Sequence, residues 1–313
     1  IFDQFTENGI ELTGNATIAA NNNFFYNTTL ISGSSDKLRS DIEFNNAYSL
    51  TKNIISNNEF SHYYYAAVYL HNNTSGTMNV DVIGNKFFGW LNPTNGNPWS
   101  VYGIYADAAP ANKYVMNINK NLVIDDTRYG IRIRNNDNAN IVGNILTYHM
   151  ASNVTFNNNT QWIRGIFLSN SALNKVEMNR IQWSTYPAGF NTTYPDKLQG
   201  ISMENVTNSN IICNKMDGMG AGVYIQNNNI GTSYITNITK NCYNGYKLNN
   251  ASIDPVGDPS TLTSYNNPFS NITSFRVAGS ISTLAKDWYY IGSNDMPTPV
   301  QGGIVSPQVA TSA

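Results

Sequence analysis

The chain has 313 residues, of which only 12% are charged, and its formal net charge is −2. Binding to nucleic acid or to an anionic membrane needs concentrated Lys and Arg, so this composition argues against both partners. No apolar run approaches the roughly 18 residues of a membrane-crossing helix, so we expect no membrane span.

Asparagine is the most unusual part of the composition, at 51 of the 313 residues. Asn tolerates the left-handed backbone conformation and hydrogen-bonds to neighbouring backbone, which suits it to turns. Low-complexity disorder is one interpretation of so much Asn. However, the 41% hydrophobic content and the 20 Tyr argue against it, because disordered chains lack aromatic residues. We therefore expect structural Asn at periodic positions.

A first motif recurs along the chain, with Gly, an aliphatic residue, any residue, an apolar residue, any residue and Asn. Its copies start at residues 9, 41, 67, 103, 130, 165, 200, 222 and 245, the earlier ones being looser. Apolar residues that alternate over such a short span predict a half-buried strand. The leading Gly suits a bend with unusual backbone angles.

A second motif lies between copies of the first, with an apolar residue, two residues, Asn, one residue and an apolar residue. It places eight Asn in one register: Asn23, Asn58, Asn85, Asn121, Asn144, Asn179, Asn214 and Asn241. A buried Asn must satisfy its amide, and stacking on the next copy would do so. The motif therefore predicts an asparagine ladder that fixes the register of successive coils. A second Asn column is expected at the ends of the first motif, for example at Asn135 and Asn170.

The two interleaved motifs resemble the right-handed parallel β-helix of the pectate-lyase-like superfamily. More narrowly, they resemble Asn-rich β-helix regions of secreted surface proteins from Bacteroidetes-type bacteria. An ordinary β-sandwich would show the alternation without Asn in a fixed register. We expect an all-β solenoid of about nine coils, with the helix at residues 1–250 and a C-terminal cap and extended tail at 251–313. The fold implies little about function, because it carries lyases, hydrolases and adhesins alike.

Aromatic residues recur at the outward positions of the first motif. This predicted column consists of Tyr69, Tyr105, Arg132, Phe167, Ser202, Tyr224 and Lys247. Flat rings along a sheet can stack on the apolar C–H faces of sugars. The alternative is that Tyr and Phe favour strands and pack on one another. The candidate ligand-binding residues are the four aromatic members, with Trp162 and Trp183 from the long insertions 147–164 and 182–199.

One charge-dense segment offers an alternative catalytic set, Asp125, Asp126 and Arg132. The resemblance implies carboxylates as acid and base in hydrolases, or as Ca²⁺ ligands in lyases. Neither the Gly-His-Gly nor the Asn-Thr-Asp motif of the hydrolases occurs, and adjacent residues of a strand point to opposite faces. A solvated ion cluster is the simpler interpretation, so we expect no catalytic residue, no metal and no cofactor, with Ca²⁺ only in the lyase case.

Cys213 and Cys242 flank two Asn of the predicted ladder. That placement puts their Cα atoms roughly 8 Å apart, beyond comfortable disulfide reach. We expect two free thiols, mostly buried.

These features favour a non-catalytic, adhesin-like module that is secreted or displayed at the cell surface. Its expected partner is a polysaccharide or another cell-surface component. Two alternatives stay open. One is a polysaccharide lyase or glycoside hydrolase. The other is a structural spacer of a larger secreted or filament-forming protein, whose remaining parts would then be its partners.

Overall fold

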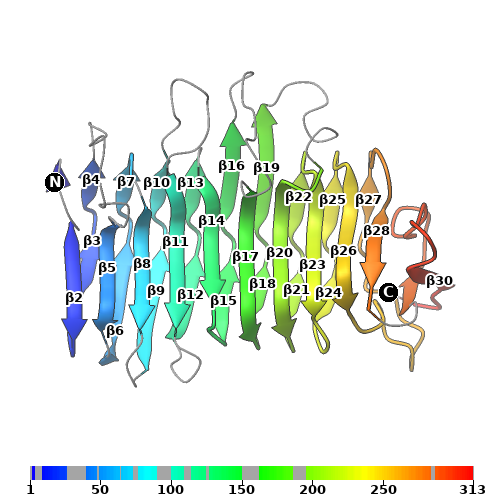
Figure 1. Ribbon diagram of the computed structural model, residues 1–313, viewed down its shortest axis with the longest axis horizontal. Helices are drawn as coiled ribbons and strands as arrows, with labels where there is room; N and C mark the ends of the chain where they lie inside the picture. The colour runs from blue at the N-terminus through cyan, green and yellow to red at the C-terminus, as the bar shows by residue number, and fades with distance from the viewer. Residues whose placement is uncertain are drawn as a thin grey trace.

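The computed structural model describes residues 2–3, 9–26, 40–47, 49–63, 65–72, 77–89, 100–108, 114–124, 127–149, 162–185, 195–282 and 286–312. Within these ranges the regular structure is entirely β, in three long sheets, here named A, B and C, and one two-stranded sheet. Figure 1 shows an elongated stack with its strands side by side from the N-terminus to the C-terminus. The described residues include no helix long and apolar enough to cross a bilayer.

The strands of each long sheet follow one another in chain order. Sheet A contains β1 (Phe2–Asp3), β4 (Phe24–Tyr26), β7 (Glu59–Ser61), β10 (Lys86–Phe88), β13 (Leu122–Ile124), β16 (Ile145–His149), β19 (Arg180–Thr185), β22 (Lys215–Asp217), β25 (Ile238–Lys240) and β27 (Phe269–Ser270). Sheet B contains β2 (Ile10–Gly14), β5 (Ser40–Ala47), β8 (Ala66–Asn72), β11 (Ser100–Ala108), β14 (Thr127–Arg134), β17 (Ile163–Ala172), β20 (Leu198–Thr207), β23 (Ala221–Asn228), β26 (Asn244–Ser252) and β28 (Val277–Ile281). Sheet C contains β3 (Ala19–Asn21), β6 (Ser49–Ser56), β9 (Met78–Ile83), β12 (Tyr114–Asn119), β15 (Ala139–Val142), β18 (Lys175–Glu177), β21 (Asn210–Ile212) and β24 (Ser233–Ile235).

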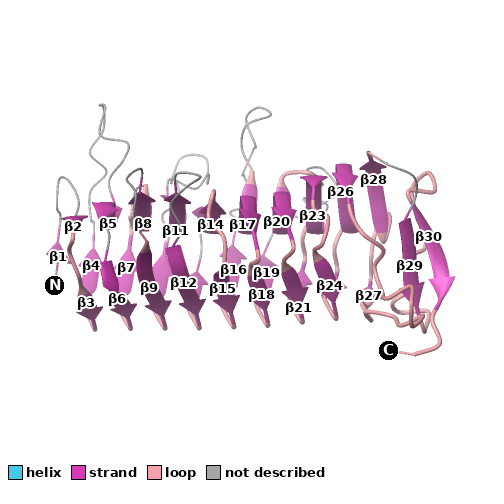
Figure 2. Ribbon diagram, turned by 90° about the horizontal axis from the view of Figure 1, so that it is seen from below, coloured by secondary structure: helices cyan, strands magenta, loops and turns pink. Residues whose placement is uncertain are grey.

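The chain passes from sheet B to sheet C to sheet A and then returns to sheet B one strand further along. Neighbouring strands within each of these sheets are parallel, as in the pairing of Ile104 with Ile131 and of Ile118 with Ile141. Each sheet is open rather than closed on itself. Figure 2 shows the same stack turned by 90°. This arrangement is consistent with a parallel β-helix.

The core lies between the three sheets and is built from columns of side chains at equivalent positions of successive strands. Ile131, Ile166 and Ile201 of sheet B are fully buried and pair in register. In sheet A, Phe60 stacks between Phe25 and Phe87, with ring centroids 4.8 Å and 5.0 Å away. Each three-strand unit therefore buries its apolar side chains against the units before and after it, as expected of a repeat protein.

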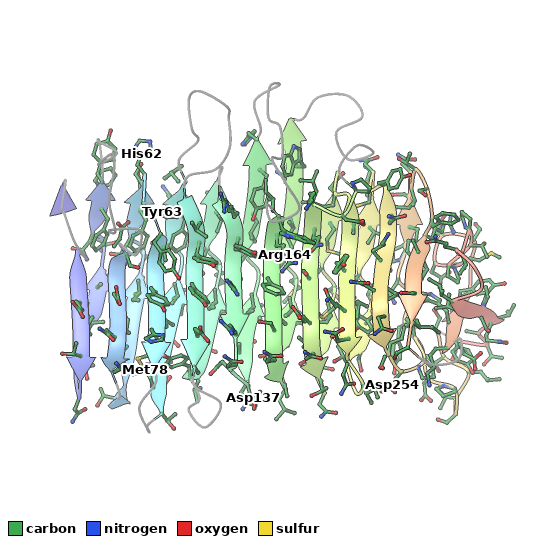
Figure 3. All side chains as sticks on the ribbon, viewed as in Figure 1. His62, Tyr63, Met78, Asp137, Arg164 and Asp254 are labelled. Atoms are coloured by element: carbon green, nitrogen blue, oxygen red, sulfur yellow. The ribbon has the colours of Figure 1, made fainter. Side chains whose placement is uncertain are left out.

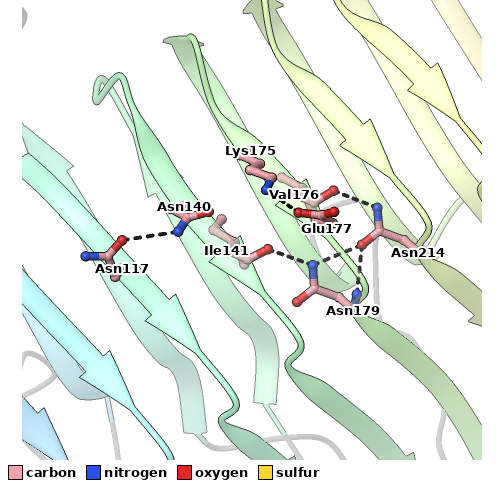
Figure 4. Close-up of polar contacts among 8 residues, drawn as sticks. All are labelled: Asn117, Asn140, Ile141, Lys175, Val176, Glu177, Asn179 and Asn214. Carbon is pink, nitrogen blue, oxygen red and sulfur yellow. Dashed lines mark hydrogen bonds and ion pairs between the residues drawn. The ribbon is translucent and has the colours of Figure 1, made fainter.

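Stacked asparagines mark the corner between sheets C and A. The side-chain amide of Asn179 donates to the carbonyl oxygen of Ile141 at 2.9 Å and to Oδ1 of Asn214 at 2.9 Å. Its own Oδ1 accepts from the backbone N–H of Asn144 at 3.0 Å. Figure 4 shows this arrangement for Asn179 and Asn214. The bonding repeats through a continuous series: Asn23, Asn58, Asn85, Asn121, Asn144, Asn179, Asn214, Asn237 and Asn267.

The series corrects one predicted member, because Asn237 stands where Asn241 was expected. Oδ1 of Asn237 accepts from Nδ2 of Asn214 at 3.0 Å, and the Asn237 side chain is fully buried. Asn241 instead follows β25, where its amide donates to Oδ1 of Asp217 at 2.8 Å. It therefore occupies the next corner of the chain, between sheets A and B.

The residue before each buried Asn adopts the left-handed conformation. Its φ is +66° at Gly84, +56° at Lys120, +53° at Met178 and +53° at Thr236. The second predicted Asn column has the same conformation at another corner, as at Asn135 (φ +54°) and Asn170 (φ +49°). Asn is tolerated there because its short polar side chain lowers the cost of positive φ.

The glycines of the first motif have a different role from the predicted one. None of Gly103, Gly165 and Gly200 has a positive φ, so unusual backbone angles do not explain why glycine occupies these positions. A Cβ atom on Gly165 would lie 2.6 Å from Cγ2 of Ile181 and 2.7 Å from the carbonyl oxygen of Gly200. Glycine is needed because the next strand and the core leave no space for a side chain.

The sheets continue past residue 250, the predicted end of the helical region. Phe269 of β27 pairs with Thr239 in sheet A, and Val277 of β28 pairs with Tyr246 in sheet B. Beyond them, β29 (Lys286–Tyr290) pairs with β30 (Val305–Val309), so the segment after Pro297 contains a strand. Trp288 of β29 is buried and packs edge-on against the Tyr246 ring at 5.0 Å.

Candidate functional site

The outer face of sheet B carries the predicted aromatic column. Strand pairing aligns seven of its positions: Tyr69, Tyr105, Arg132, Phe167, Ser202, Tyr224 and Lys247. The rings of Tyr69 and Tyr105 stack at 5.1 Å. The register therefore brings together residues that lie far apart in the sequence.

Residues just before the motif glycines join this face, which the sequence pattern did not predict. The Tyr102 ring lies 4.4 Å from Tyr105 and 5.1 Å from Tyr129. Strict strand alternation would put Tyr102 and Tyr105, three residues apart, on opposite faces. The signal available in the sequence was the recurring large residue before Gly, in Tyr102-Gly103, Tyr129-Gly130 and Arg164-Gly165.

Most of the predicted ligand-binding rings are covered rather than exposed. Tyr105 and Phe167 are 4% exposed and Tyr224 is 6% exposed. Tyr69 and Trp162 are half-buried and keep accessible surface. The ring contacts favour mutual packing for Tyr105 and Phe167. Direct stacking on a ligand is confined to the half-buried rings.

Trp183 lies away from this face. It belongs to β19 of sheet A, is 5% exposed, and stacks on Tyr148 at 5.8 Å within the core. The structure therefore separates Trp183 from the other predicted ligand-binding rings. Ile181 and Trp183 are two residues apart on one strand, so alternation places both on the buried face.

Two arginines lie among the aromatic rings. The Cζ atom of Arg132 is 4.9 Å from the Tyr105 ring, 5.3 Å from Tyr129 and 5.5 Å from Phe167. The Cζ atom of Arg164 is 4.1 Å from Phe167 and 4.9 Å from Trp162. Both guanidinium groups thus make cation–π contacts, which stabilise a cation more strongly where water is excluded. Figure 3 labels Arg164 on this part of the molecule.

The two arginines differ in their hydrogen bonds and burial. Arg132 donates to the hydroxyl of Tyr102. Arg164 is 8% exposed and forms no ion pair within the described part of the chain, and burial lowers its pKa. An arginine stays protonated at neutral pH even so, because its ordinary pKa lies far above neutrality. Nε of each arginine is buried without a hydrogen-bond acceptor among the described residues.

Two of the carboxylates near this face already have partners. Asp107 accepts from the Tyr105 hydroxyl at 2.9 Å and lies 3.6 Å from Arg134. Asp196 lies 3.3 Å from Lys247. Glu204 acts electrostatically on Arg164 without an ion pair between them in the described structure. Neither Arg132 nor Arg164 therefore has an ion-pair partner among the described residues, and Lys197 adds a third cation 4.4 Å from the Trp162 ring.

Two members of the alternative catalytic set, Asp125 and Asp126, lie outside the described residues. The third, Arg132, packs among aromatic rings. The described residues contain no cluster of three or more His, Cys, Asp or Glu side chains suited to hold a metal ion.

The two cysteines are free, as predicted, but only one is buried. Cys213 precedes Asn214 with a φ of +54°, which turns its side chain outward. Cys242 is fully buried, and burial raises the pKa of its thiol to about 12.

Comparisons with protein-family models, with curated proteins and with solved structures found no match for this chain.

Proposed function

We propose that this chain is a non-catalytic extracellular module that binds carbohydrate on the outer face of sheet B. The observation that carries this proposal is the cluster of aromatic rings and guanidinium groups on that face. Binding sites for small ligands combine apolar and aromatic surface with a few polar groups that fix orientation. Tyr69 and Trp162 supply accessible ring surface, and Arg132 supplies hydrogen-bond donors.

The proposed architecture is a right-handed parallel β-helix of about nine coils, as in the pectate-lyase-like superfamily that the motifs resemble. Terminal repeats of such proteins need a cap, because their strand edges would otherwise pair with other chains. Burial of Trp288 against Tyr246 supports a capping role for β29 and β30. A rigid rod with a side face for glycans suits an adhesin-like protein that is secreted or displayed at the cell surface.

Binding of the purified chain to immobilised polysaccharides and to a glycan array tests this function. We expect retention of the wild-type chain and reduced retention of Tyr69→Ala and Trp162→Ala. Each truncation removes about 1 kcal/mol or more of ring contact. Tyr290→Ala is the matched control, because Tyr290 is a half-buried aromatic residue on β29, outside sheet B.

Two results would overturn the proposal. One is the absence of binding to every glycan tested. The other is release of reducing or unsaturated ends from a bound polysaccharide, which would make the chain an enzyme.

A further inference from the structure

Arg132 and Arg164 share the same two aromatic rings. Their Cζ atoms lie 5.3 Å and 5.8 Å from the Tyr129 ring, and 5.5 Å and 4.1 Å from the Phe167 ring. Those two rings are themselves 5.9 Å apart. Two positive charges are thus held together by one aromatic pair. Burial is the largest cause that lowers the pKa of Arg164, and the charge of Arg132 lowers it further.

This arrangement of two cations lowers the stability of the folded chain when no ligand is bound. Like charges repel more strongly where water is excluded, and a buried cation is normally paired with an anion. Arg164 is more than nine-tenths buried without an ion-pair partner among the described residues. The cation–π contacts and the charge of Glu204 offset part of this cost, but neither guanidinium has an ion-pair partner among the described residues.

The unused donors of the two groups point to an oxyanion as the missing partner. Aromatic rings pack against both guanidinium groups, and the hydrogen bonds of a guanidinium form in its own plane. The Nε–H groups of both residues lack acceptors in the described structure. The planar fork of an arginine matches carboxylate and other oxyanions. Arg132 is half-buried and accessible, and the buried Arg164 adds a second positive charge beside the same rings.

We propose that Arg132 and Arg164 receive an anionic group of the bound glycan, so that the ligand is an acidic polysaccharide bearing carboxylate or sulfate. This inference rests on the proposed carbohydrate-binding function and names the ligand class. A nucleic acid is disfavoured, because a phosphate backbone needs a track of cations and this chain has a net charge of −2.

Affinity electrophoresis of the full chain through two matched pairs of polymers tests the inference. One pair is alginate and carboxyl-reduced alginate, and the other is dextran sulfate and dextran. We expect retention by at least one charged polymer and at most weak retention by its neutral partner. The more effective charged polymer identifies the group as carboxylate or sulfate. Retention should weaken as NaCl is raised, because salt screens an accessible charge.

Substitutions locate the effect. Arg132→Gln should lower the affinity for the charged polymer by about tenfold or more, as expected for loss of a charge-assisted hydrogen bond. Arg164→Gln should lower it in the same direction, and Arg132→Lys should retain part of it. Arg180→Gln is the control, because it removes the same charge from an exposed position on sheet A. Circular dichroism and thermal melting establish that each variant is folded.

The outcomes separate this inference from the proposed function. Equal binding to charged and neutral partners would overturn the anionic ligand and leave carbohydrate binding intact. Binding to none of the polymers would overturn both. Unchanged binding by folded Arg132→Gln and Arg164→Gln, or tighter Arg-dependent binding to an oligothymidylate, would also overturn the inference.

Discussion

At the scale of single residues, each buried Asn satisfies backbone groups that the corner between sheets C and A leaves unpaired. Asn237 donates to the carbonyl oxygen of Ile211 at 2.7 Å and accepts from the backbone N–H of Asn214 at 3.1 Å. Removing the side chain leaves both backbone groups buried without partners, and each such group costs roughly 1–3 kcal/mol.

Two nearby substitutions distinguish Asn237 from Asn241. Asn237→Ala should lower the free energy of unfolding by about 3 kcal/mol. Asn241→Gly should change it by less than about 1 kcal/mol, because Asn241 is partly exposed and glycine accepts its φ of +52°. Urea denaturation monitored by circular dichroism measures both. An equal loss from the two substitutions would contradict the assignment of Asn237 to the stack.

The two thiols should differ sharply in reactivity, since only a thiolate reacts and only an accessible one is reached. Exposed Cys213 should react with Ellman's reagent in the native protein at pH 8. Cys242 should react only after denaturation, because burial holds its pKa near 12 and keeps it protonated. Release of two equivalents of thionitrobenzoate from the native chain would show that Cys242 is accessible.

At the scale of elements, the sequence pattern predicted the strands of sheet B and their outward column, because alternation reports directly which face is buried. It misplaced one Asn for a physical reason. Tyr234, Asn237 and Thr239 have the spacing of the second motif, but buried Thr239 is polar, so the fully apolar copy Ile238, Asn241 and Tyr243 fitted better. It also missed Tyr102, because the strand departs from strict alternation at Gly103.

The close approach of neighbouring strands at the motif glycines leads to a prediction about stability. Gly165→Ala should lower the free energy of unfolding by about 1–3 kcal/mol, because the added methyl group would overlap Ile181 and the backbone of Gly200. Gly292→Ala is the control, since its nearest neighbour would be Oδ1 of Asp295 at 3.9 Å. Thermal melting of both variants measures the difference. A melting temperature for Gly165→Ala equal to that of the wild type would show that the strands can separate at no cost.

At the scale of the whole molecule, the outer face of sheet B is a continuous surface across parallel strands about 4.8 Å apart. Such a surface suits an extended polymer that lies along the rod. Tyr69, Tyr105, Phe167 and the two arginines lie on the neighbouring strands β8, β11, β14 and β17 within it, and Trp162 directly precedes β17. The ladder and the core hold these strands in register, so the fold itself positions the proposed binding residues.

The most direct measurement is a ¹H–¹⁵N spectrum of the arginine Nε–H groups, with and without an acidic oligosaccharide. Arg132→Lys and Arg164→Lys variants assign the two signals. Both signals should shift on titration with the ligand, while the signal of Arg180 stays in place. Shifts confined to arginines outside sheet B, or none at Arg132 and Arg164 while the ligand binds, would contradict the proposal.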